Sequence, residues 1–284
     1  MKLFRKSLSV ILSLILIVSV FAFPISVNAD SGTVIARTWS EIKAALEDGK
    51  DGTVVIKTPL TTEVPSSERI IMNGGNKTLD IRDNVINIST TGDVAFCNLI
   101  TINGGSLSIK GFSYLKYTYY ISSEYTSTKK DSAICYVNGG NLSVENCELR
   151  CDSGACVKVN SGYTDIGLGT TLTATSQWVL RDTPTGNGKI SISEDAYIGT
   201  IDGSGMCTQG SNEGYGALRL DSDNTELLVT AAKFNGGVQL RSEKQTEQFE
   251  YSSGKKTLTI GSDVIGYKLQ SDINTAVEME HKYY

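Results

Sequence analysis

The chain has 284 residues, with 26 Lys or Arg against 31 Asp or Glu, so that its formal net charge is −5. An acidic chain without a Lys/Arg cluster is unlike the proteins that bind nucleic acid, and we expect no nucleic-acid partner. Its one histidine, His281, lies near the end of the chain, which excludes a Ser-His-Asp site within the main body of the sequence.

Residues 1–29 have the layout of a secretory signal peptide. Basic residues within the first six positions precede an apolar run from Leu8 to Phe23, and Val27-Asn28-Ala29 supplies the small residues of a cleavage site. The apolar length alone also fits an uncleaved membrane anchor, but the Val-x-Ala ending favours cleavage after Ala29. We therefore predict a secreted, extracellular protein, in solution or at a cell surface, with no transmembrane anchor in the mature chain.

The segment TWSEIKAALEDG predicts one amphipathic helix over about residues 38–48. Thr38 and Glu41 match the T-x-x-E capping box, and Gly49 supplies a C-terminal stop. One face of this helix collects the apolar residues at helical spacing, which are Trp39, Ile42, Ala45 and Leu46.

After this helix the chain reads as short β-strands. Segments such as GTVVIKT, KTLDIRDNVINI, SLSIKG and NLSVEN alternate apolar with polar residues and are separated by Gly, Asn, Asp and Ser. This period of two predicts strands with one buried face.

A phrase built on Asn-Gly-Gly recurs along the strands. It begins at Met72, Ile102 and Val137, with weaker copies at Val159 (VNSG) and Phe234 (FNGG). Because Gly and Asn tolerate a positive φ, each copy predicts a turn. A hairpin would use the same turn, but similar side chains returning after 30, 35 and 22 residues favour stacked coils.

Stacked coils would align equivalent side chains about 4.8 Å apart. We predict that the helix over 38–48 covers the open end of the first coil. We also predict three ladders of aligned side chains, which are Asn73, Asn103 and Asn138 at the turn, and in the interior Leu79, Leu107 and Leu142 beside Ile81, Ile109 and Val144.

A helix of the form W-x-E-I-x-x-A-L, then GTVVIKTPL and coils of the form I-x-G-G-x-L-x-I, resembles the pectate-lyase-like superfamily, especially its exported Gram-positive surface proteins. The resemblance covers residues 33–267. It implies an all-β fold, a single-stranded right-handed parallel β-helix of about seven or eight coils with an N-terminal capping α-helix. One domain would span residues 30–284, with coils over about 52–267 and a short C-terminal tail. Activity does not follow, because this superfamily includes lyases, hydrolases, esterases, tailspikes and adhesins.

The resemblance offers a Ca²⁺-dependent, pectate-type polysaccharide lyase as one alternative. Such lyases hold Ca²⁺ on acidic residues of one parallel sheet, next to an Arg or Lys base. Arg181 in VLRDTPTG is similar to a lyase arginine, but its second basic partner is missing. The acidic residues share no register: Glu145, Asp152, Asp202, Asp221 and Asp223. We therefore expect no catalytic residue, no metal site and no cofactor, with DSDNTE at Asp221 as a weak Ca²⁺ candidate that reads better as a solvated turn.

Six cysteines allow fifteen disulfide pairings, among which sequence cannot choose. Cys97, Cys135 and Cys156 each end an apolar step before an Asn-x-Gly turn, which favours a buried ladder without chemistry. One or two disulfides are the alternative in an exported protein.

The candidate binding residues lie in the segment 114–130, which fills the extra length between two Asn-Gly-Gly copies. If Leu115, Tyr117, Tyr119 and Ile121 face inward, Tyr114, Lys116 and Tyr120 face outward, and Tyr125 follows in the same segment. Amphipathic rings beside a cation suit a carbohydrate or protein partner, although tyrosine also simply favours strands.

Three functions remain open. The first is a non-catalytic exported protein that binds a polysaccharide, a surface glycan or a surface protein through Tyr114, Lys116, Tyr120 and Tyr125. The second is the Ca²⁺-dependent lyase, and the third is a structural spacer without a ligand.

Overall fold

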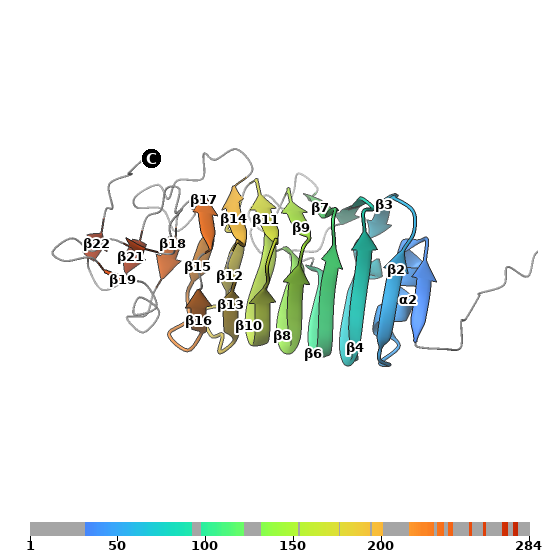
Figure 1. The fold of residues 1–284 in the computed structure, drawn as a ribbon, viewed down its shortest axis with the longest axis horizontal. Helices are drawn as coiled ribbons and strands as arrows, with labels where there is room; N and C mark the ends of the chain where they lie inside the picture. The colour runs from blue at the N-terminus through green and yellow to red at the C-terminus, as the bar shows by residue number, and fades with distance from the viewer. Residues whose placement is uncertain are drawn as a thin grey trace, which may run out of the picture.

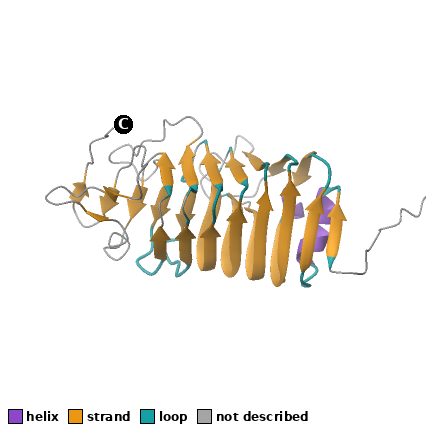
Figure 2. Ribbon diagram, viewed as in Figure 1, coloured by secondary structure: helices purple, strands orange, loops and turns teal. Residues whose placement is uncertain are grey.

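The computed structural model describes residues 32–92, 98–121, 132–152, 154–175, 177–193, 195–200, 216–229, 232–235 and 238–240, together with four short strands beyond them. The predicted signal peptide lies outside these residues. The described chain is predominantly β, and most of its strands belong to two sheets that run side by side along the long axis of the molecule (Figures 1 and 2).

The first sheet has 13 strands, which pair in parallel except at its last pair, β21 with β22. Its strands are β1 (Thr33–Ala36), β2 (Gly52–Ile56), β4 (Ile70–Arg82), β6 (Asn98–Gly111), β8 (Ala133–Glu145), β10 (Ala155–Ile166), β12 (Leu180–Asp182), β13 (Lys189–Ile192), β15 (Leu218–Leu220), β16 (Glu226–Val229), β18 (Val238–Leu240), β21 (Leu269–Ser271) and β22 (Thr275–Val277).

The second sheet has seven strands in the order β17-β14-β11-β9-β7-β5-β3. Its strands are β3 (Leu60–Pro65), β5 (Ile86–Gly92), β7 (Tyr114–Ile121), β9 (Glu148–Cys151), β11 (Thr171–Ala174), β14 (Tyr197–Thr200) and β17 (Lys233–Asn235). A separate antiparallel pair joins β19 (Glu250–Tyr251) to β20 (Leu258–Thr259).

The chain alternates between the two large sheets. From β2 it crosses to β3, returns to β4, crosses to β5 and continues in this way, so that each return adds a strand beside the previous one. We call one such passage a circuit. Because neighbouring strands come from successive circuits, a residue of one circuit lies beside its counterpart in the next.

The Asn-Gly-Gly copies at Met72, Ile102 and Val137 lie inside β4, β6 and β8, not between separate strands. The pairing of β4 with β6 shifts register at Asn73, and Gly75 and Gly105 have φ of +78° and +71°. Each copy therefore bends one long strand. At the next circuits the bend separates two strands, because β12 and β13 pair with the two halves of β10. The copy at Phe234 differs, since it begins in β17 of the second sheet.

The predicted asparagine ladder is confirmed and is longer than expected. The side-chain amide of Asn103 donates to Asn73 at 3.0 Å, that of Asn138 to Asn103 at 3.1 Å, and that of Asn160 to Asn138 at 2.8 Å. The hydroxyl of Thr183 donates to Asn160 at 2.5 Å. Five circuits are thus joined through one polar row, as the spacings of 30, 35 and 22 residues indicated.

The interior ladders are correct in the later circuits and wrong in the first. Leu107 pairs with Leu142, and Ile109 pairs with Val144, as predicted. Leu79, however, pairs with Ile109, two residues from the predicted Leu107. Ile81 therefore does not pair with the predicted Ile109, and it lies at a second register shift of β4 against β6.

Lys77 explains this displacement. It holds the position beside Leu107 and is only 4% exposed. Its Nζ lies 2.7 Å from Asp48 Oδ1, so the buried ammonium group is neutralised. Burial opposes ionisation of Asp48, but the hydrogen bonds and charge of Lys77, together with the Lys50 amide, lower its pKa. Because a charged residue stands in this otherwise apolar ladder, matching hydrophobic residues along the sequence gives the wrong register for this circuit.

The one α-helix among the described residues, α2 (Trp39–Glu47), forms where it was predicted. Thr38 and Glu41 make the reciprocal capping-box hydrogen bonds, and Gly49 has a φ of +72°. The buried face consists of Trp39, Ile42, Ala45 and Leu46. Tertiary contacts fix α2 against the following strands, because Trp39 Nε1 donates to Glu68 O of the 3₁₀ turn η1 (Ser66–Glu68) at 2.8 Å. No helix within the described ranges is long and apolar enough to cross a membrane.

One hydrophobic core fills the space between the sheets. The alternation read from the sequence holds, since the inward apolar residues of the predicted strands are at most 2% exposed. These include Val54, Ile56, Leu79, Ile81, Leu107, Ile109, Leu142 and Val144. The core continues into the second sheet through Leu115, Tyr117, Leu149 and Leu172.

Candidate functional site

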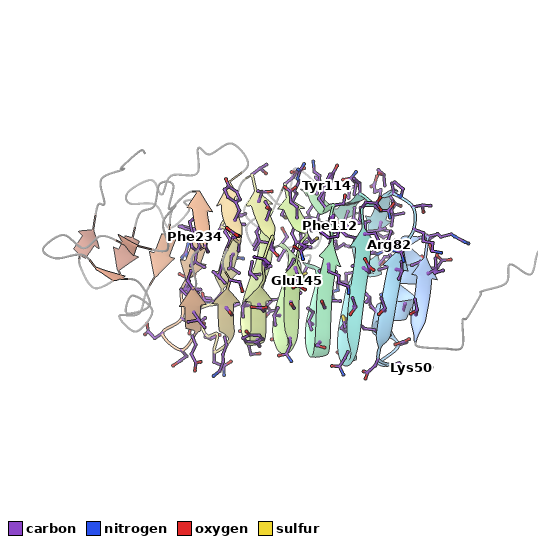
Figure 3. All side chains as sticks on the ribbon, in the orientation of Figure 1. Lys50, Arg82, Phe112, Tyr114, Glu145 and Phe234 are labelled. Carbon is purple, nitrogen blue, oxygen red and sulfur yellow. The ribbon has the colours of Figure 1, made fainter. Side chains whose placement is uncertain are left out.

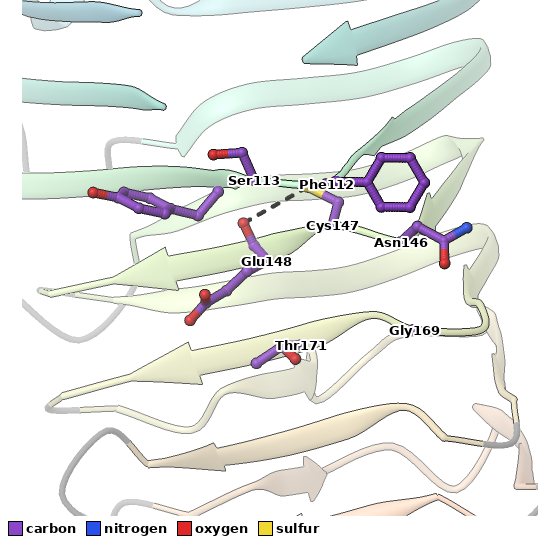
Figure 4. Close-up of a pocket in the computed structure, with 8 residues that line it drawn as sticks. Phe112, Ser113, Asn146, Cys147, Glu148, Gly169 and Thr171 are labelled. Carbon is purple, nitrogen blue, oxygen red and sulfur yellow. Dashed lines mark hydrogen bonds between the residues drawn. The ribbon is translucent and has the colours of Figure 1, made fainter. Parts of the chain in front are cut away.

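An open hollow of about 410 Å³ lies where the chain turns from the first sheet into the second, at the starts of β7, β9 and β11. We call it the corner groove. Three successive circuits line it, with the residues Phe112, Ser113, Tyr114, Asn146, Cys147, Glu148, Gly169 and Thr171 (Figure 4).

Short-range backbone geometry forms this corner. Asn146, like Asp195 in a later circuit, turns the chain with a positive φ (50° and 61°), a conformation that short polar side chains tolerate. The Glu148 amide donates to Ser113 O at 3.0 Å, and the Asn146 amide donates to Leu168 O at 3.0 Å. Backbone hydrogen bonds between circuits therefore hold the groove walls in fixed relation.

Phe112 is the most unusual residue of the groove. Its side chain is 86% exposed, although it lies in a turn between two buried strand segments (Figure 3). Figure 4 shows its ring beside the side chain of Asn146 on one side of the hollow, while Glu148 extends on the other. A largely exposed aromatic ring beside a polar hollow is available to a ligand.

Tyr114, one of the predicted binding residues, is held by ionic contacts. The Arg150 guanidinium lies over its ring, 4.4 Å from the centroid. Arg150 Nε lies 2.6 Å from Glu148 Oε1, and Nη2 lies 2.8 Å from Glu148 Oε2. This two-point pairing raises the pKa of Arg150 and fixes the orientation of its guanidinium group.

Lys116, also predicted to bind, faces outward two residues further along β7. Its Nζ lies 2.7 Å from Asp152 Oδ2, which also accepts a hydrogen bond from the Thr118 hydroxyl at 3.0 Å. Lys116 therefore carries a neutralised charge and borders the corner groove without lining it.

The predicted orientation of β7 is confirmed where its side chains are described. Leu115, Tyr117 and Tyr119 are at most 3% exposed. The side chain of Tyr120 and the whole of Tyr125 lie outside the described residues. The interpretation of residues 114–121 as inserted chain is wrong, because they form a regular strand that pairs with β5 and β9. Phe112 was missed.

Cys147 is among the residues that line the groove, but its side chain is only 3% exposed. Burial, followed by the neighbouring charge of Glu148, raises its pKa to about 12. The thiol is therefore protonated at neutral pH.

The expectation of buried cysteines is confirmed for Cys135, Cys147, Cys151 and Cys156, each at most 3% exposed. Cys135, Cys147 and Cys156 are free thiols, and burial also raises the pKa of Cys135 and of Cys156. The predicted stacking of Cys135 on Cys156 is wrong, because Cys135 lies beside Val157 in the parallel sheet. Cys97 and Cys207 lie outside the described residues.

Three of the five acidic residues considered for a lyase, Glu145, Asp152 and Asp221, lie beside a cationic residue. Glu145 lies beside Lys110 on the first sheet, whereas Asp152 binds Lys116 on the second. Asp221 Oδ1 lies 2.8 Å from Arg219 Nε, and Arg219 follows Arg181 in one row. Asp202 lies outside the described residues. Within the described ranges there is no group of three or more Cys, His, Asp or Glu side chains suited to a metal ion.

Asp182 is a second residue that sequence reasoning missed. It is 2% exposed and accepts hydrogen bonds from the Asp221 amide (2.5 Å), the Ser222 amide (3.1 Å) and the Thr225 hydroxyl (2.7 Å). The segment from Asp221 is thus held by a buried carboxylate, and Ser222 and Thr225 are buried, so the solvated turn expected there is only partly right.

We expect Asp182 to make stability depend on pH. Burial is the main cause that raises its pKa from 3.8 to about 6, against the opposing effect of its hydrogen bonds. The folded state therefore holds this proton more tightly than the unfolded state, and stability should fall as the pH rises from about 4 to about 6. The loss should be on the order of 2 kcal/mol. Urea unfolding at pH 4, 5, 6 and 7 measures it.

An Asp182→Asn variant is the control for this effect. It should be less stable at every pH, because one acceptor oxygen is replaced by a donor group, but its stability should change less between pH 4 and 6. If the parent and the variant show the same slope of unfolding free energy against pH, Asp182 is not the responsible group.

The comparisons with known proteins found no relative of this chain. No protein-family model, no curated protein and no solved structure matches the chain.

Proposed function

We propose that the chain is an exported, non-catalytic β-helix protein whose corner groove binds carbohydrate at or near a cell surface. The fold within this proposal is a right-handed parallel β-helix, similar to the pectate-lyase-like superfamily, with α2 covering its first coil. The alternation of parallel strands between two sheets and the five-circuit polar row support this fold.

The observation that carries the function is Phe112, with 86% of its surface exposed at the rim of the groove. Burying an aromatic ring against the apolar face of a sugar is favourable, and leaving it in water has no structural benefit. Nearby polar groups suit sugar hydroxyls: the Asn146 amide donates and accepts, the Glu148 carboxylate accepts, and the Thr171 hydroxyl does both.

The groove also fits binding better than catalysis. Glu148 is committed to Arg150 at 2.6 Å and 2.8 Å, and the Cys147 thiol is protonated. Neither group is prepared to transfer a proton to or from a substrate. The ion pair between Glu148 and Arg150 also holds the groove in one arrangement. This fixed arrangement lowers the conformational entropy lost when a ligand binds.

A Phe112→Ala variant tests this proposal. Glycans retained by the parent protein on a glycan array should bind the variant about tenfold more weakly, because one stacking contact is worth about 1.5 kcal/mol. Phe112→Trp should retain binding. Dissociation constants from calorimetry give the comparison.

Leu228→Ala is the matched control, since Leu228 is 56% exposed on β16 of the other sheet. It should bind as the parent does. Binding that is unchanged in Phe112→Ala, or the absence of any bound glycan, would rule out the groove as a carbohydrate site.

A further inference from the structure

The corner groove continues into a straight row of outward residues on the second sheet. Tyr114 pairs with Glu148, Glu148 with Thr171, and Thr171 with Tyr197, on four neighbouring strands. The next residue of each strand points inward and is at most 1% exposed, namely Leu115, Leu149, Leu172 and Ile198. The four row residues therefore share the outer face.

This row sets the direction and the length of a ligand. Neighbouring strands lie about 4.8 Å apart, so Tyr114 and Tyr197 are about 14 Å apart, with a carboxylate and a hydroxyl between them. The first three residues line the groove, and Tyr197 lies one strand beyond it. A ligand that contacts both tyrosines must be elongated and must lie across the strands.

The charges around the row decide what kind of chain fits. The groove lining contains one ionisable carboxylate, Glu148, and no cation, while the row continues beyond Tyr197 to Lys233 on β17. The cations nearest to it on β7 and β9 are already neutralised, Arg150 by Glu148 at 2.6 Å and Lys116 by Asp152 at 2.7 Å. An acidic chain would have to approach Glu148 and break one of these pairs, both of which cost free energy.

We infer that the groove recognises a neutral chain of pyranose sugars, laid along the row from Tyr114 to Tyr197. This inference rests on the proposed function and specifies its ligand. A neutral chain satisfies Glu148 and Thr171 through its hydroxyls while its ring faces cover Phe112 and the tyrosines. It differs from the acidic polysaccharide that the family resemblance implies.

The test compares chain charge and chain length by calorimetry. The probes are the β-1,4-linked hexasaccharides of glucose, xylose and mannose, their disaccharides, and the hexasaccharide of galacturonic acid. At least one neutral hexasaccharide should bind tenfold or more tightly than its disaccharide, because a disaccharide cannot reach both tyrosines. The galacturonic acid chain should bind at least tenfold more weakly than that neutral chain.

Tyr197→Ala should weaken hexasaccharide binding about tenfold and leave disaccharide binding unchanged. Tyr197→Phe, which keeps the ring, should bind as the parent does and shows whether loss of the ring is responsible. Tyr163→Ala is the control, because Tyr163 is 42% exposed on β10 of the other sheet. It should have no effect.

Three results would overturn the inference: no neutral hexasaccharide binds, the acidic chain binds as tightly, or Tyr197→Ala leaves hexasaccharide binding intact. If some other glycan still binds in a manner that requires Phe112, the proposed function stands and only this assignment of its ligand is lost.

Discussion

A Gly105→Ala variant is expected to lose about 3–5 kcal/mol of unfolding free energy, a large part of the roughly 5–15 kcal/mol that stabilises a typical domain. Gly105 has a φ of +71°, where a Cβ is unfavourable. More important, an added Cβ would overlap the carbonyl oxygen of Gly75 in the preceding circuit. Because Gly75 and Gly105 lie between paired residues of β4 and β6, neither backbone segment can move apart without disturbing the flanking strand pairs. Urea unfolding measures the loss.

Variants of two other glycines distinguish the cost of a positive φ from the cost of the steric overlap. Gly49 also has a positive φ (+72°), but an added Cβ meets nothing within 4 Å, so Gly49→Ala should cost only about 1 kcal/mol. Gly74 has open space as well, and its φ is not in the restricted range. Gly74→Ala should be nearly neutral. A Gly105→Ala variant no less stable than Gly49→Ala would mean that the circuits are not packed as closely as described.

Replacing Tyr117 by alanine should cost about 4 kcal/mol, since a fully buried aromatic ring is removed and a cavity remains. Its hydroxyl lies 2.9 Å from the Thr90 hydroxyl, which is also buried. Tyr117→Phe should therefore cost about 1–2 kcal/mol, because Thr90 loses this partner. Thermal and urea unfolding would both report these differences.

A double variant checks the hydrogen bond itself. Thr90→Val together with Tyr117→Phe removes both polar groups, and its cost should be less than the sum of the two single changes. Lys116→Ala, next to Tyr117 but on the outer face, should cost no more than about 1 kcal/mol. Additive costs for the two core changes would contradict the described contact.

The sequence was sufficient for features that depend on neighbours in the chain or on exact repetition. The capping box of α2 needs only Thr38 and Glu41, three residues apart, and it formed as predicted. The asparagine row was predictable because one residue type returns at the same place in the repeated phrase. The inward residues of β7 followed from strict alternation.

Features that depend on distant partners were not predictable. The role of Asp182 arises from groups 39 to 43 residues away, and nothing near it in the chain indicates them. Lys77 replaced an apolar ladder residue because Asp48 lies within reach only in the folded state. Counting from Asn73 to Asn103, instead of matching hydrophobic residues, would have given the correct register.

The corner groove was only half predicted. Tyr114 was chosen because tyrosines cluster around it, whereas Phe112 stands alone between Gly111 and Ser113 and reads as part of a loop. Its signal was the break in alternation, since a large aromatic ring directly after a turn glycine continues neither strand. The groove itself joins three circuits, so no single segment of sequence contains it.

The hydrogen bonds of the asparagine row give the molecule a dipole along the direction in which the circuits stack. Each of its four hydrogen bonds runs the same way, with the donor in the later circuit and the acceptor in the earlier one. The amide dipoles therefore add head to tail, as peptide dipoles do in a helix, and each bond polarises the next. An aspartate at any interior position would supply no donor and would interrupt this alignment. The row thus distinguishes one end of the stack from the other, independently of the polypeptide direction.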